Sequence, residues 1–92
     1  MLTVVAGSPF EVKLNANPTT GYMWELVSLP DGVRLLGKDF EQQPDAAIGD
    51  GGTQIFHFQT EQPGTFDLQF ELRRRWETAP IESHVVQVEA TD

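Results

Sequence analysis

The sequence lacks cysteine altogether and has only two histidines among its 92 residues. A chain without cysteine can form no disulfide and no thiolate metal site, and it has no thiol nucleophile. The two histidines, His57 and His84, stand with no serine that indicates a nucleophile, and their spacing with the aspartates does not match a zinc site. We therefore expect no enzymatic activity, no bound metal and no cofactor.

Positive charge is scarce as well. Six Lys and Arg residues stand against 14 Asp and Glu, which gives a net charge of −8. Such a balance argues against a nucleic acid or an anionic membrane surface as partner. No apolar run approaches the ~18–20 residues that a membrane-spanning helix needs. Because a removed signal peptide leaves no trace, the compartment stays open: periplasmic or secreted if one has been removed, cytoplasmic otherwise.

The length limits the organisation of the chain. A single hydrophobic core typically organises ~100–200 residues, so residues 1–92 are expected to form one domain. Hydrophobic residues make up 39% of the sequence, which is enough for a folded core. No internal repeat or linker is visible, and a monomer is expected.

The dominant pattern is an alternation of apolar and polar residues. Between Phe66 and Leu72, for example, every second residue is Phe or Leu and those between are polar or charged. A period of two is typical of half-buried β-strands, and no segment shows a sustained helical period. Turn residues separate seven expected strands: Thr3–Ala6, Phe10–Asn15, Tyr22–Ser28, Val33–Phe40, Gln54–Thr60, Thr65–Arg73 and Glu82–Ala90.

Short strands at this spacing predict an all-β fold, either a sandwich or a barrel. Unequal loops favour an immunoglobulin-like, two-sheet antiparallel β-sandwich of about seven or eight strands with no disulfide. Trp24 is then expected in the core, without the cysteine pair that flanks the core tryptophan of an immunoglobulin domain.

Alternate loops of such a sandwich gather at one end. Three of them would share that end: Asn17-Pro18-Thr19-Thr20-Gly21-Tyr22, the loop with Gly49-Asp50-Gly51-Gly52, and the loop that begins Arg73-Arg74-Arg75-Trp76. Pro18 and two β-branched threonines restrict the first loop, so it should be a stiff, narrow projection. The plainer interpretation is that the first loop only turns the chain and that the arginines are a solvated charge run. The glycine-rich second loop lacks the following Lys-Ser/Thr and helix of a phosphate-binding loop, and its flexible backbone would let another surface approach closely.

Taken together, the three loops resemble the signature loops of the chagasin family of cysteine-peptidase inhibitors: NPTTG followed by an aromatic residue, GxGG, and RPW. The order and spacing match from Phe10 to Ala90, except that Arg75 stands where the family has proline. The resemblance implies that Thr19 and Thr20 approach the catalytic cysteine of a papain-like peptidase, and that the other two loops grip the flanks of its cleft. The peptidase-binding residues it implies are Asn17, Pro18, Thr19, Thr20, Gly21, Tyr22, Gly49, Asp50, Gly51, Gly52, Arg74, Arg75 and Trp76.

The predicted function is therefore reversible, tight, noncovalent inhibition of a papain-like cysteine peptidase. The alternative is an immunoglobulin-like adhesion or assembly module that uses the same loop end or an edge strand.

Overall fold

The computed structural model describes residues 1–16, 21–42, 52–74 and 76–92. Within these residues the secondary structure consists of strands and no helix, so none of them forms a helix that could cross a membrane. The strands are β1 (Leu2–Val5), β2 (Pro9–Ala16), β3 (Tyr22–Ser28), β4 (Val33–Gln42), β5 (Gly52–Thr60), β6 (Gly64–Arg74) and β7 (Glu82–Thr91).

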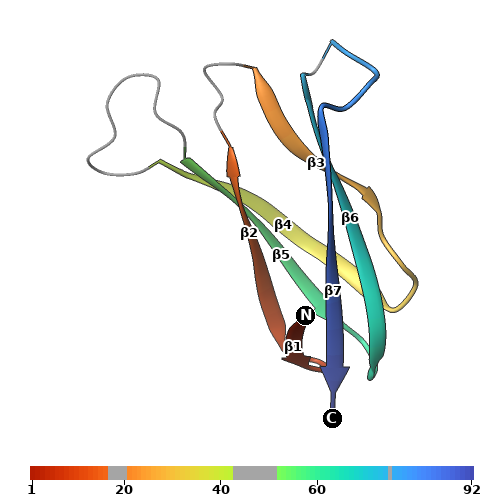
Figure 1. Ribbon diagram of the computed structural model, residues 1–92. Coiled ribbons are helices and arrows are strands. Elements are labelled where there is room, and N and C mark those ends of the chain that lie inside the picture. The colour runs from red at the N-terminus through yellow and green to blue at the C-terminus, as the bar shows by residue number, and fades with distance from the viewer. Residues whose placement is uncertain (17–20, 43–51, 75) are drawn as a thin grey trace.

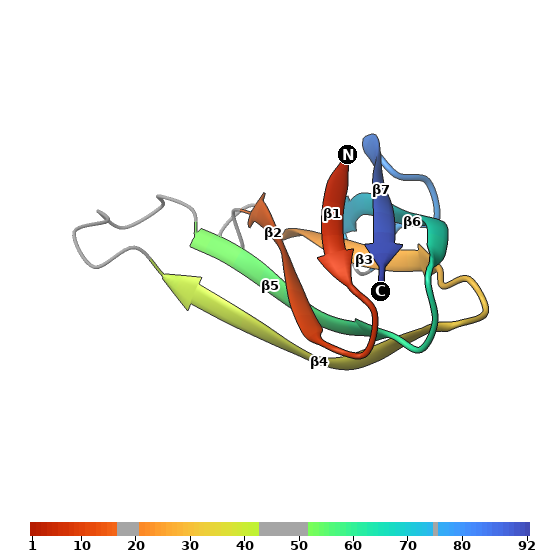
Figure 2. The same cartoon turned by 90° about the horizontal axis from the view of Figure 1, so that it is seen from below.

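The strands form two sheets that face each other (Figures 1 and 2). One sheet has the order β1-β7-β6-β3 and the other the order β2-β5-β4. Pairing is antiparallel except between β1 and β7, which run parallel with Leu2 opposite Val88. The predicted immunoglobulin-like sandwich is confirmed. Among the described strands, β1 and β7 are the pair that runs parallel.

The core lies between the sheets and is built from the alternating residues of the facing strands. Phe56 and Phe58 of β5 and Leu68 and Phe70 of β6 are at most 1% exposed. The Phe56 and Phe70 rings come within 4.9 Å, centroid to centroid, and so join the two sheets directly. Trp24 is 8% exposed, as expected for the core tryptophan. Aromatic contacts of this kind supply much of the stabilising burial in a small domain without disulfides.

The seven predicted strands are all present, and their ends differ by a few residues at most. The most consequential difference is at β6, which continues to Arg74 because Arg74 pairs with Tyr22 at the start of β3. The predicted loop that begins at Arg73 thus starts after Arg74.

The strand ends that flank the three predicted loops gather at one end of the sandwich (Figure 1). In one sheet, Gly52 at the start of β5 is opposite both Ala16 and Gln42, the last residues of β2 and β4. In the other sheet, Tyr22 is opposite Arg74. We refer to this end of the molecule as the loop end.

Candidate functional site

Five of the residues implicated by sequence lie within the described part of the chain: Gly21, Tyr22, Gly52, Arg74 and Trp76. The remaining candidates lie outside the described residues: Asn17, Pro18, Thr19, Thr20, Gly49, Asp50, Gly51 and Arg75. The structure brings four of the five described residues together, while Gly52 belongs to the opposite sheet.

Trp76 is the most exposed large aromatic side chain at the loop end. Its exposed fraction is 70%, yet one edge of its indole covers Gly21. A Cβ atom placed on Gly21 would lie 3.1 Å from Cη2 of Trp76, and Gly21 has a φ of +83°, which favours glycine. Glycine is required here both for the backbone conformation and for the approach of the indole.

Arg74 lies between two aromatic rings. The centre of its guanidinium is 4.4 Å from the centroid of the Tyr22 ring and 5.9 Å from that of Trp76. Its Nη1 also lies 3.3 Å from Oε1 of Glu77, whose backbone N–H donates to the carbonyl of Arg74 at 3.0 Å. These contacts connect the beginning of β3 to the connection between β6 and β7.

Gly52 is buried where β4 and β5 come together. A Cβ atom at this position would lie 2.5 Å from Cζ of Phe40 and 2.6 Å from the carbonyl oxygen of Glu41. The second predicted loop therefore enters β5 at a position that has no room for a side chain.

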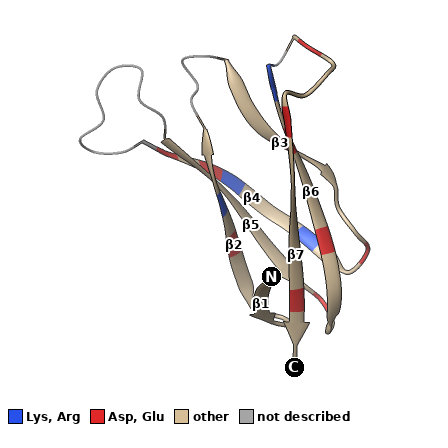
Figure 3. Ribbon diagram, viewed as in Figure 1, with Lys and Arg blue, Asp and Glu red and all other residues tan. Residues whose placement is uncertain are grey.

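The basic cluster of the sequence is divided by the pleat of β6. Arg73 and Arg74 are consecutive strand residues, so their side chains leave opposite faces of the sheet. Arg73 Nε donates to Oε2 of Glu25 at 2.6 Å, and Arg73 Nη2 contacts the same oxygen. Acidic residues accompany the basic end of β6 in the nearby connection and at the start of β7 (Figure 3). Arg73 and Arg74 therefore do not form a single basic patch.

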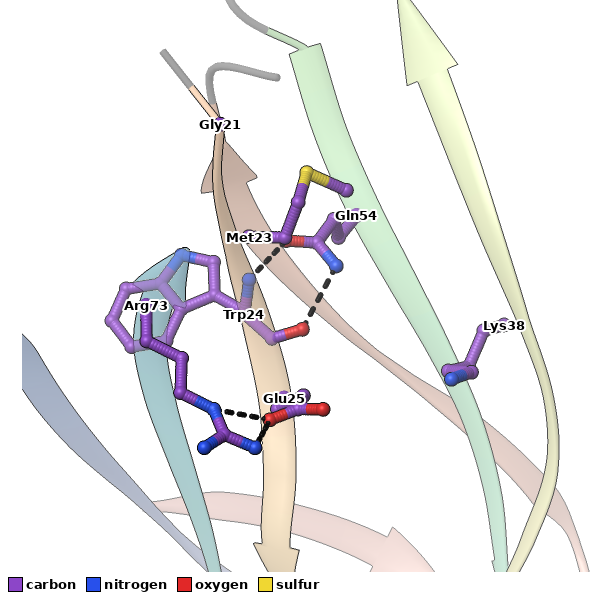
Figure 4. A pocket seen from close by; sticks show the side chains of 7 residues that line it. All are labelled: Gly21, Met23, Trp24, Glu25, Lys38, Gln54 and Arg73. Carbon is purple, nitrogen blue, oxygen red and sulfur yellow. Dashed lines mark hydrogen bonds and ion pairs between the residues drawn. The ribbon is translucent and has the colours of Figure 1, made fainter. Parts of the chain in front are cut away.

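A pocket of about 270 Å³ lies beside the loop end, between the edge strand β3 and the opposite sheet (Figure 4). Its lining residues are Gly21, Met23, Trp24, Glu25, Lys38, Gln54 and Arg73. Sequence reasoning did not single out Gln54, which is 8% exposed and alternates with Phe56 and Phe58 on the inward face of β5. The sequence signal that could have identified Gln54 is that a polar residue occupies an inward position of β5, where the alternation otherwise places apolar residues.

His57 contacts the two strands that neighbour β5, whereas His84 on β7 reaches β3, two strands away in its sheet. Nε2 of His57 lies 2.7 Å from Oδ2 of Asp39 on β4, and its Nδ1 lies 3.6 Å from Oε1 of Glu11 on β2. His84 meets the edge of Trp24 at a centroid distance of 6.2 Å. Among the described residues, no three His, Asp or Glu side chains gather in a way that could hold a metal ion.

Comparison with known proteins gives concordant results. The family model described as "Chagasin family peptidase inhibitor" matches residues 3–89. Chagasin from Trypanosoma cruzi is 31% identical over 80 residues, which are 82% of this chain and 73% of that protein.

Two solved structures share the fold. A cysteine protease inhibitor from Entamoeba histolytica superposes with a TM-score of 0.76 at 20% identity, over 98% of this chain and 87% of that one. The solution structure of amebosin gives a TM-score of 0.75 at 24% identity, with the same coverage of 98% and 87%.

Proposed function

Because the chain belongs to the chagasin family of peptidase inhibitors, we propose that it inhibits papain-like cysteine peptidases by reversible, tight binding. Membership of an inhibitor family confirms the expectation that the chain is not an enzyme. The proposed partner is the peptidase alone, bound by one monomeric inhibitor domain.

The observation that carries the proposal is the contact between Gly21 and Trp76. Gly21 closes the NPTTG motif and Trp76 closes the motif that resembles RPW. The two residues are 55 positions apart in the sequence (76 − 21 = 55), and only folding brings them together. Residues so distant in sequence and in contact at the loop end are what a composite binding surface requires.

The mechanism we propose is occlusion of the active-site cleft. The small, neutral residues Thr19 and Thr20 would enter the cleft, and the loops that end at Gly52 and begin after Arg74 would contact its two flanks. A loop that is ordered before binding loses little conformational entropy when it binds. Without a cysteine, the inhibitor cannot form a disulfide with the catalytic thiol, and we expect the complex to be noncovalent and reversible.

The test is a titration of papain with the purified chain, followed through hydrolysis of a fluorogenic peptide, with trypsin as the control enzyme. We expect inhibition of papain, no inhibition of trypsin, and full recovery of papain activity after the complex is dissociated. Equal inhibition of trypsin, or a stable covalent adduct in a mass spectrum, would contradict the proposal. Failure to inhibit any papain-like peptidase would favour the adhesion or assembly module instead.

A further inference from the structure

The side chain of Arg74 makes several contacts within the molecule itself. Its guanidinium lies over the Tyr22 ring and faces the Trp76 ring, and it also pairs with Glu77. The aliphatic part takes part as well, because a Cβ atom on Gly21 would lie 3.6 Å from Cγ of Arg74. The side chain thus contacts both the beginning of β3 and the residues that follow β6.

Trp76 is largely exposed, so its described contacts with Gly21 and Arg74 bear directly on where the indole lies. Its exposed fraction is 70%, and among the described residues the edge of the indole at Cη2 and Cζ2 lies against Gly21. An exposed aromatic side chain with few contacts would otherwise sample several rotamers, and a partner would bind only the fraction in the competent one.

We propose that Arg74 is a positioning residue that holds Trp76 against Gly21, so that these two residues form one preformed surface before the peptidase arrives. This inference rests on the proposed function. In this proposal the guanidinium acts within the molecule, by contacting the Tyr22 and Trp76 rings. Its planar shape matters because a flat group stacks on aromatic rings.

The decisive experiment is a double-mutant cycle that combines Arg74→Gln with Trp76→Ala, with dissociation constants measured against papain. If Arg74 acts through Trp76, Arg74→Gln should weaken binding about tenfold in the parent and less than about twofold when Trp76 is already alanine. A direct contact between Arg74 and the peptidase would instead cost the same factor in both backgrounds, and that result would overturn the proposal.

The matched control is Arg73→Gln. Arg73 is the adjacent residue of β6 and carries the same charge, but it leaves the other face of the sheet and pairs with Glu25. We expect this variant to bind papain within about twofold of the parent. Arg74→Lys separates charge from shape: a lysine that fully restores binding would overturn the role of the planar guanidinium.

A second measurement is made on the free protein and does not depend on inhibition. In the parent and in Arg73→Gln, nuclear Overhauser contacts should connect the Gly21 Hα atoms with the indole of Trp76, and the Gly21 signals should be shifted by the ring current. Arg74→Gln should weaken both effects while the remaining spectrum stays that of a folded protein. Unchanged Gly21 signals would overturn the inference even if the parent inhibits papain. If the parent fails to inhibit, the proposed function fails, and these signals still decide whether Arg74 positions Trp76.

Discussion

The side-chain amide of Gln54 hydrogen-bonds to both backbone groups of Trp24. Gln54 Oε1 accepts from the Trp24 N–H at 2.7 Å, and Gln54 Nε2 donates to the Trp24 carbonyl at 3.1 Å (Figure 4). Because β3 is an edge strand of its sheet, no described strand lies beside it on the side that these backbone groups face. Gln54 takes the place of that strand and ties the two sheets together close to the loop end.

The amide bridge predicts a large cost for Gln54→Leu. The substitution keeps a side chain of similar size but leaves the N–H and C=O of Trp24 without partners, and each buried unpaired group costs about 1–3 kcal/mol. We expect the free energy of unfolding to fall by about 2–4 kcal/mol in chemical denaturation. Gln59→Leu on the same strand is the control, because its hydrogen bond to the Gly7 carbonyl is exposed. An equal loss of unfolding free energy in the two variants would contradict the proposed contribution of the Gln54 bridge.

Gly52 gives a second stability prediction. In Gly52→Ala the new methyl group would lie 2.5 Å from Phe40 Cζ and 2.6 Å from a backbone oxygen, so the strands must shift. We expect a loss of about 1–3 kcal/mol, as for other overpacked sites. Gly37→Ala is the matched control on β4, since a Cβ atom there meets nothing within 4 Å. Denaturation curves for both variants and the parent test the difference, and an unchanged midpoint for Gly52→Ala would refute it.

A third prediction concerns Thr60, which is fully buried on the inward face of β5. Its Oγ1 has no hydrogen-bond partner among the described residues. Valine has nearly the same shape and no hydroxyl to desolvate, so Thr60→Val should raise the stability by about 1 kcal/mol. Thermal unfolding should move up by roughly 4–8 °C. Thr53→Val, on the outer face of the same strand, should change stability by less than about 0.5 kcal/mol. A lower melting temperature for Thr60→Val would indicate that the hydroxyl is paired in solution.

The strands could be predicted from sequence because their burial follows the alternation so closely. Leu68 and Phe70 are fully buried, as their spacing predicted, and turn residues mark the strand limits. The parallel partnership of β1 with β7 could not be predicted, since a four-residue strand such as Leu2–Val5 carries almost no information about its neighbour.

The candidate site was predictable in its parts but not in its contacts. The motifs marked Gly21 and Trp76 separately, and only the fold shows that one covers the other. The separation of Arg73 from Arg74 could have been anticipated, because two consecutive strand residues face opposite ways, but it required knowing that β6 extends to Arg74. The bridging role of Gln54 depends on the open edge of β3, which is a property of the sheet order.

Thr19→Arg tests the proposed tip of the first loop. A long cation would replace a small side chain that must enter a narrow cleft, so we expect the inhibition constant for papain to rise at least ~10-fold, which is about 1.4 kcal/mol. Changes in exposed loops usually alter stability by ~0.5 kcal/mol or less, and the melting temperature should stay close to that of the parent. A variant that inhibits like the parent, or one that unfolds, would show that Thr19 is not at the tip.

Trp76→Ala tests the third loop. If the exposed indole becomes buried against the peptidase, its loss should act mainly on dissociation and cost ~2 kcal/mol or more, close to 30-fold in affinity. Association should change little, because the substitution removes no charge. Ile81→Ala is the control: Ile81 is also an exposed apolar residue, at 59%, in the connection between β6 and β7, but it belongs to none of the three motifs. Surface-plasmon kinetics against papain at low and high salt distinguish the two variants. If Trp76→Ala and Ile81→Ala dissociate at the parent rate, the arginine at position 75 has directed the indole away from the peptidase, and the third loop contributes no aromatic anchor.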